Sequence, residues 1–151
     1  MKRLAITLAI SAFLAAPALA AGDDVFTKQS EEPFADITQA VNDAIVNRGY
    51  AVDYHGFIGE MLKRTAADVG ATKELYKDAE FFTFCSAVVS RKVMEGDPGD
   101  IAYCPYVVFV YEPADMPGKV TVGFRKLPAG GARDEVNTLL TGIVEEAAGG
   151  M

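Results

Sequence analysis

Two apolar stretches decide the fold of this 151-residue chain: FFTFC at residues 81–85 and CPYVVFVYE at residues 104–112. Both are rich in aromatic and β-branched residues, which strands favour. The first stretch ends on Cys85 and the second begins at Cys104. If the two strands are antiparallel neighbours, the end of the first lies beside the start of the second. We therefore expect the two cysteines to lie close together, although the 18 residues between them also permit a parallel crossover.

A tight hairpin is expected directly after the second stretch. Residues 113–118 form a turn signal with proline and glycine, and residues 120–125 alternate apolar and polar side chains. This alternation predicts a strand paired with residues 106–112. Further strands are expected at residues 25–28 and 50–58.

Residues 50–58 are expected to place Tyr50, Val52 and Tyr54 on one face of their strand. Helical spacing of apolar residues indicates helices, in part weak ones, at residues 34–45, 59–79, 87–95 and 132–148. Ser30 is expected to cap the first helix, and Gly49 to end it in a left-handed conformation.

The order of these elements predicts an α+β fold. Strands and helices do not alternate as parallel units, and one hairpin is clear. We expect a mostly antiparallel sheet of about five strands with helices packed on one face.

The N-terminus has the three parts of an export signal. A basic pair at residues 2–3 precedes an apolar run at residues 4–14, and ALA at residues 18–20 is a cleavage pattern. We expect a signal peptide at residues 1–20, a single domain at residues 21–151, and a periplasmic or secreted location. In such compartments thiols tend to be oxidised.

The charge balance excludes several partner classes. Cleavage after Ala20 would leave 12 basic residues against 21 acidic ones, a formal charge of −9. We expect no binding to nucleic acid or to anionic membrane surfaces, because both require neutralising cations. No second apolar run is long enough to span a bilayer, so we expect no integral membrane segment after cleavage.

Three interpretations of Cys85 and Cys104 are open. They form a structural disulfide, they are buried as small apolar side chains, or they serve as a functional thiol, redox pair or ligand set. The sequence has no C-x-x-C motif and therefore gives no local support to thioredoxin-like exchange. Since it also has no C-x-x-C-H motif, covalent c-type haem is excluded.

His55 is the single histidine of the sequence. A zinc site needs about four ligands, and the soft candidates are His55, Cys85, Cys104 and the methionines. A non-covalent haem or copper site that uses His55, a cysteine, or a methionine such as Met61 or Met94 is the sharper version of this hypothesis. The cofactor, if there is one, is unknown from the sequence.

Three tyrosines lie in or next to the second stretch, namely Tyr103, Tyr106 and Tyr111. They either line a pocket or pack in the core or a dimer interface. A single histidine and no G-x-S-x-G motif provide no nucleophile–base set. We therefore expect a small-ligand or protein-binding module rather than an enzyme. The alternative is a periplasmic redox or metal/haem-binding protein that uses the cysteines.

The chain also resembles a known family over residues 25–148. The resemblance rests on the helix-to-strand segment at residues 34–50, FCSA at residues 84–87, the Asp97-Pro98 loop and the stretch at residues 104–112. In these segments the chain is similar to the DUF302 family, which has no assigned activity. The resemblance implies an α+β fold like that of the TATA-binding protein, and often a homodimer.

The chain departs from the commoner DUF302 pattern at both cysteines. Many members have Cys-Asn-Pro where this chain has Cys85-Ser86-Ala87, and Pro-Cys where it has Cys104-Pro105. If there is a site, we expect it first around Cys85 and Cys104.

Overall fold

A computed structural model describes residues 24–149 of the chain. The predicted signal peptide at residues 1–20 lies outside the described residues. None of the helices within residues 24–149 combines the length and the apolar character that a bilayer crossing requires.

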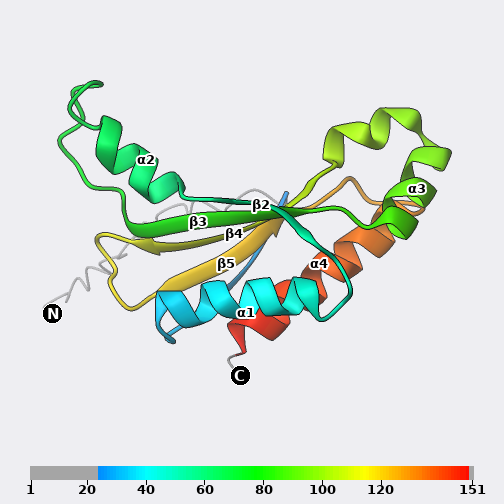
Figure 1. The fold of residues 1–151 in the computed structure, drawn as a ribbon, viewed down its shortest axis with the longest axis horizontal. Coiled ribbons are helices and arrows are strands. Elements are labelled where there is room, and N and C mark those ends of the chain that lie inside the picture. The colour runs from blue at the N-terminus through cyan, green and yellow to red at the C-terminus, as the bar shows by residue number, and fades with distance from the viewer. Residues whose placement is uncertain (1–23, 150–151) are drawn as a thin grey trace, which may run out of the picture.

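One antiparallel sheet forms the centre of the molecule, with the strand order β1-β5-β4-β3-β2 (Figure 1). Its strands are β1 (Val25–Ser30), β2 (Val52–Gly56), β3 (Tyr76–Phe84), β4 (Tyr106–Pro113) and β5 (Val120–Arg125). The helices are α1 (Phe34–Val46), α2 (Ile58–Thr65), α3 (Ala87–Gly96), the 3-10 helix η1 (Pro98–Tyr103) and α4 (Arg133–Ala148). The predicted α+β class with a five-stranded sheet is confirmed.

The long helices α1 and α4 pack side by side on one face of the sheet (Figure 1). Alternate residues of the central strands point to this face and are buried there, among them Phe84, Val108 and Phe124. Apolar residues of both helices complete the core. Burial of this continuous apolar face is the main stabilising term of the fold.

The opposite face of the sheet, which we call the open face, carries no long helix (Figure 1). Phe81 of β3 lies opposite Phe109 of β4 there, and Tyr54 is 60% exposed. A side chain at Gly56 would collide with the Phe81 ring, and one at Gly123 with the Phe109 ring. These two glycines therefore let the aromatic rings lie flat on the neighbouring strands.

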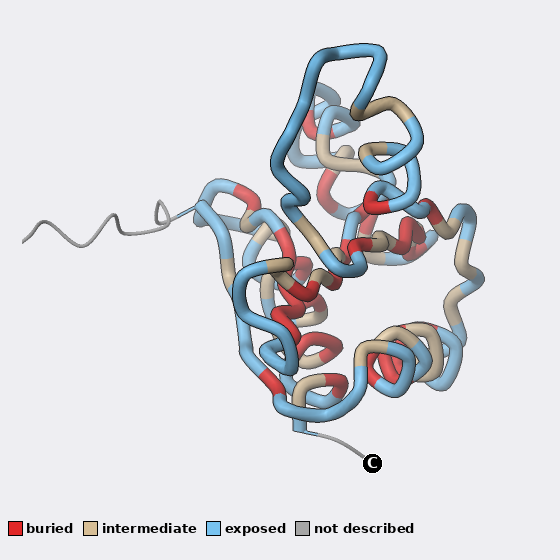
Figure 2. Tube along the Cα trace, turned by 90° about the vertical axis from the view of Figure 1, so that its left-hand side faces the viewer, coloured by how far each residue is buried: buried red, intermediate tan, exposed pale blue. Residues whose placement is uncertain are grey.

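At one end of the sheet, α2 and residues 66–75 project away from the body of the molecule (Figure 1). We call this segment the arm. Figure 2 shows that the arm is mostly exposed. Its contacts with the sheet include the close approach of Gly59 to the backbone of Ala79, where a Cβ would collide, and a hydrogen bond from Lys63 to the Lys77 carbonyl.

Several sequence expectations are corrected by the structure. Ser30 ends β1 and accepts a hydrogen bond from the Glu32 backbone, so it does not cap α1, which begins after Pro33. The strand β3 begins at Tyr76, inside the stretch expected to be partly helical. The reason is tertiary, because Tyr76 and the residues after it pair with β4.

A second correction concerns β2. A register shift lies between Val52 and Tyr54, so the expected common face of Tyr50, Val52 and Tyr54 is wrong. Tyr50 stacks on Phe84 in the core, whereas Tyr54 contacts Phe81 on the open face. An irregularity of this kind redirects side chains without changing the local composition.

Candidate functional site

A disulfide joins Cys85 and Cys104 at the end of the sheet opposite the arm. Their Cα atoms are 6.5 Å apart, within the usual range for a disulfide. The cause is the antiparallel register, in which Phe84 of β3 lies opposite Tyr106 of β4. The expected proximity of the two cysteines is confirmed.

A buried polar contact lies behind the disulfide. The Ser90 hydroxyl of α3 donates a hydrogen bond to the Tyr106 hydroxyl at 3.0 Å and lies 3.8 Å from the sulfur of Cys104. Tyr106 is 3% exposed, and this burial raises the pKa of its hydroxyl. Tyr106 therefore belongs to the core, and it also lines the cavity beside Cys104.

Beside Cys104 the molecule has a cavity of about 360 Å³, which we call the cleft. Its floor is formed by β4, β5 and β1 on the open face, and one wall by the end of η1. Its lining residues include Val25, Tyr103, Pro105, Val107, Phe109, Arg125 and Leu127. Most of these side chains are apolar, which is typical of sites for small organic molecules.

The cleft continues into a wider, more polar hollow of about 740 Å³. Tyr103, Arg125 and Leu127 line both spaces. Lys126 and Asp24 also line the hollow, where the Lys126 backbone donates a hydrogen bond to the Asp24 carbonyl at 2.7 Å. The combined site has an apolar floor and charged groups at its mouth.

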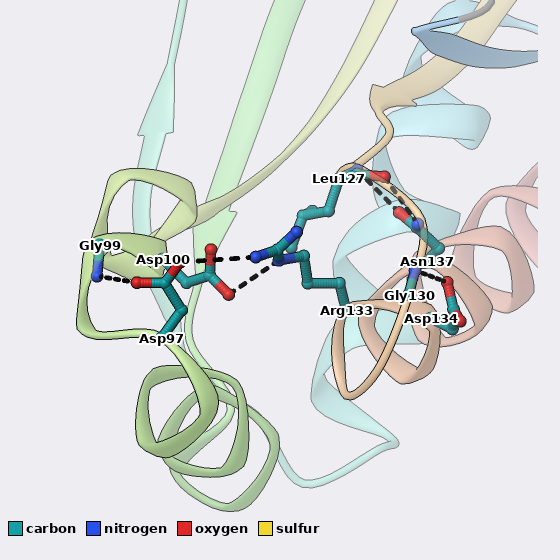
Figure 3. A network of polar contacts seen from close by, with 8 residues as sticks. All are labelled: Asp97, Gly99, Asp100, Leu127, Gly130, Arg133, Asp134 and Asn137. Atoms are coloured by element: carbon teal, nitrogen blue, oxygen red, sulfur yellow. Dashed lines mark hydrogen bonds and ion pairs between the residues drawn. The ribbon is translucent and has the colours of Figure 1, made fainter.

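The first turn of α4 anchors the η1 wall of the cleft (Figure 3). Arg133 points toward η1 and donates a hydrogen bond from Nε to Asp100 Oδ2 at 2.9 Å. A second carboxylate, Asp97, lies 3.6 Å from its guanidinium and accepts a hydrogen bond from the Gly99 backbone. These acids raise the pKa of Arg133, with the hydrogen bond to Asp100 as the largest cause.

The same helix anchors the opposite wall (Figure 3). Asn137 accepts a hydrogen bond from the Leu127 backbone N–H at 2.9 Å and donates one to the Leu127 carbonyl at 3.0 Å. Asp134 accepts a hydrogen bond from the Gly130 backbone at 2.9 Å. Both walls of the cleft are therefore fixed by side chains from the N-terminal end of α4.

Two neighbouring cations, Arg125 and Lys126, stand at the mouth of the cleft. Neither forms an ion pair with another residue in the part of the chain that the structure describes. Arg125 is exposed and lies opposite Val25 in the sheet register. In a strongly acidic chain, this is a local reversal of charge.

His55 lies on the helix-covered face, near the edge of the sheet. Its Nε2 is 2.6 Å from Glu80 Oε2, and its ring stacks on Phe82 with the centroids 4.1 Å apart. Residues 24–149 contain no group of three or more His, Cys, Asp or Glu side chains suited to a metal ion. A role for His55, Cys85 or Cys104 as ligands or as a functional pair stays a prediction.

The sequence led us to expect a site around Cys85 and Cys104, and the cleft lies beside Cys104, but several residues that shape the cleft were missed. Of the three tyrosines considered, Tyr103 and Tyr106 line the cleft, while Tyr111 lies on the open face and contacts Phe109. Arg125, Leu127 and Arg133 were not singled out. The available signal was the basic pair at residues 125–126, which lies at the end of a strand in an acidic chain.

A second cavity, of about 260 Å³, lies in the arm between α2 and residues 71–76. Most of its lining residues are exposed, and the ion pair between Lys63 and Glu74 beside it is half-exposed on both sides. The cleft is the better-built site, because its walls are anchored by buried or half-buried groups.

The comparisons with known proteins agree with this picture at the level of fold. No protein-family model and no curated protein matches the sequence. The fold is similar to the crystal structure of an uncharacterized conserved protein DUF302 from Bacillus stearothermophilus, with a TM-score of 0.66 and 12% sequence identity. The match covers 83% of this chain and 99% of that chain. The chain therefore has the fold of a DUF302 protein, in agreement with the resemblance seen in its sequence.

Proposed function

We propose that this protein is a small-ligand-binding module and that the cleft is its binding site. The observation that carries the proposal is a mostly apolar cavity of about 360 Å³ with two anchored walls. Small-molecule sites have volumes of roughly 300–1,000 Å³, with an apolar lining and a few polar groups. The cleft meets each of these criteria.

The anchored walls favour binding because they reduce its entropic cost. Arg133 fixes the η1 wall through Asp100, and Asn137 fixes the Leu127 wall. The disulfide ties the start of β4 to the end of β3. A ligand that enters a site of this kind orders few additional groups, so more of its contact energy appears as affinity.

A library of small organic molecules tests the proposal by protein-observed NMR. We expect hits to shift the backbone signals of Tyr103, Val107 and Leu127. In Val107→Trp, a large ring occupies the floor of the cleft, and the hits lose their effect. Val88→Trp is the matched control, because Val88 is 79% exposed on α3 and lies outside the cleft lining.

Two results would contradict the proposal. One is a library with no hits near the cleft, and the other is binding that Val107→Trp leaves unchanged. A Soret band or a stoichiometric metal in the purified protein would instead support the alternative, a redox or metal/haem-binding protein that uses the cysteines.

We further propose that the protein is exported to the periplasm or secreted, and that it matures by cleavage after Ala20. The signal pattern supports this location, and a disulfide is most compatible with an oxidising compartment. Mass spectrometry of protein from the native host should give an N-terminus at Ala21. Intact Met1 in a soluble cytosolic fraction would contradict it.

A second candidate function, protein binding by self-association, has its own observation. The open face exposes Tyr54 and Val107 beside the rings of Phe81 and Phe109. A second copy of the chain would bury this apolar surface, and the resemblance to DUF302 implies that the protein is often a homodimer. Sedimentation equilibrium should then detect a dimer that Tyr54→Glu dissociates and Val88→Glu does not. A monomer at high concentration would exclude this candidate.

A further inference from the structure

We infer that the ligand of the cleft is a small organic carboxylate with an apolar body. This inference rests on the proposed function and adds the chemical class of the ligand. The carboxylate lies at the mouth beside Arg125, and the apolar body lies on the floor formed by Val107 and Phe109.

The pattern of ion pairing leaves Arg125 and Lys126 without an acidic partner. Residues 24–149 contain 12 basic side chains. Eight of them have an acidic partner within 4.0 Å in this part of the chain. Of the remaining four, Arg64 and Lys73 belong to the arm, and Arg125 and Lys126 are neighbours at the cleft. In an acidic protein, two adjacent cations without an acidic partner favour an anion from solution.

The chemistry of the two cations favours a carboxylate as the anion. The guanidinium of Arg125 is planar and matches the two oxygens of a carboxylate. Lys126 adds a point charge. Its backbone N–H donates a hydrogen bond to the Asp24 carbonyl, and the acidic residue Asp24 lines the same hollow. This acid opposes ligands of high negative charge. The balance therefore favours a monoanion over a phosphate-rich ligand.

The lining on the inner side of Arg125 is apolar and favours a ligand with an apolar body. Val25, Val107, Phe109 and Leu127 present apolar atoms, and Tyr103 adds an aromatic ring. A small anion such as acetate, with a single methyl group, would leave most of this floor wet and gain little from it. An aryl or short alkyl group attached to the carboxylate removes both surfaces from water, which contributes affinity in proportion to the apolar area buried.

The test uses phenylacetate and its uncharged analogue phenylacetamide, which have nearly the same shape. Calorimetry or NMR titration of the wild-type protein at low salt should give an affinity about tenfold higher for phenylacetate, as one charge-assisted hydrogen bond at a partly exposed site supplies. Arg125→Gln should abolish this preference. Arg64→Gln, which removes an unpaired cation from the arm, should preserve it. Added salt should weaken the binding of phenylacetate and leave the binding of phenylacetamide unchanged.

The outcomes separate the two proposals. If both probes bind at the cleft with equal affinity, the cleft is a ligand site and the assignment of a carboxylate is wrong. If a preference for phenylacetate persists in Arg125→Gln, the anion lies elsewhere and the inference is also overturned. If neither probe binds and no library molecule shifts the cleft signals, the proposed function fails together with the inference.

Discussion

At the end of the sheet where β3 leads into α3, a disulfide, a buried hydroxyl pair and Arg133 fix the connecting segments. At the opposite end, the arm projects from the sheet with mostly exposed residues, among them Val69 at 74% and Leu75 at 53%. The difference shows that the tertiary contacts outside the common core are concentrated at the end of the sheet that carries the disulfide. Segments with few buried contacts open locally at low free energy, whereas a segment anchored on several sides opens with the whole fold.

The contrast has a functional meaning. A binding site requires walls that keep their geometry, and the cleft lies at the anchored end. The arm has a cavity of its own but no comparable anchors. The following four changes test this contrast, ordered from the largest expected effect to the smallest.

Removing the disulfide should give the largest effect. In Cys85→Ala/Cys104→Ala, we expect the free energy of unfolding to fall by about 3 kcal/mol, because the unfolded chain regains the entropy that the cross-link removed. Urea denaturation measures the change. Addition of a dithiol reductant should also lower the free energy of unfolding of the wild-type protein, and it should leave that of the variant unchanged. A loss below about 1 kcal/mol would show that the disulfide contributes little at this end.

Arg133→Met should destabilise the protein by about 2 kcal/mol, because it leaves the carboxylate of Asp100 buried without a charged partner. The side chain of Asp100 is 7% exposed. The matched control is Arg91→Met on α3, whose partner Glu95 is 66% exposed, with an expected change below about 0.5 kcal/mol. Urea denaturation of both variants should separate them. Equal losses would contradict the special role of Arg133.

Glu112→Gln tests a buried carboxylate near the arm, whose partner Lys77 is 58% exposed. The Gly118 backbone N–H, 2.7 Å away, and Lys77, 2.9 Å away, together lower the pKa of Glu112 below its usual range. A lowered pKa stabilises the fold above the ordinary glutamate pKa, and this stability is lost as the pH falls through the lowered value. We expect the variant to lose about 1 kcal/mol at neutral pH.

The pH profile provides the control for this change. Between neutral pH and about pH 3, the stability of the wild type should fall more than that of Glu112→Gln, so the two curves converge in acid. Glu60→Gln, at an exposed position of α2, should run parallel to the wild type. A constant difference between Glu112→Gln and the wild type would contradict the assigned cause.

Lys63→Ala should give the smallest effect. Its side chain pairs with Glu74 at 3.0 Å, but both groups are more than half exposed. We expect a change in global stability below about 0.5 kcal/mol. Amide hydrogen exchange should nevertheless become faster within residues 66–75, while the amides of η1 stay unchanged. Slower or unaltered exchange in the arm would show that this pair does not order it.

The sequence predicted the regular elements wherever the apolar pattern is local. Alternation at Val120, Val122 and Phe124 identified β5, and the helical spacing around Leu140 identified α4. The proximity of Cys85 and Cys104 followed from their places at the ends of two neighbouring strands. The 3-10 helix η1 was missed, because Asp97-Pro98-Gly99 is equally compatible with a turn.

What the sequence by itself determined is the antiparallel sheet, its long helices and the end at which the cysteines meet, because these depend on periodicities of a few residues. The tertiary structure alone decided the cleft. Its floor combines three strands that are distant in the chain, and its walls depend on Arg133 reaching Asp100 and Asn137 reaching Leu127. Such contacts leave no local pattern, since a side chain's partner is fixed only when packing brings the two elements together.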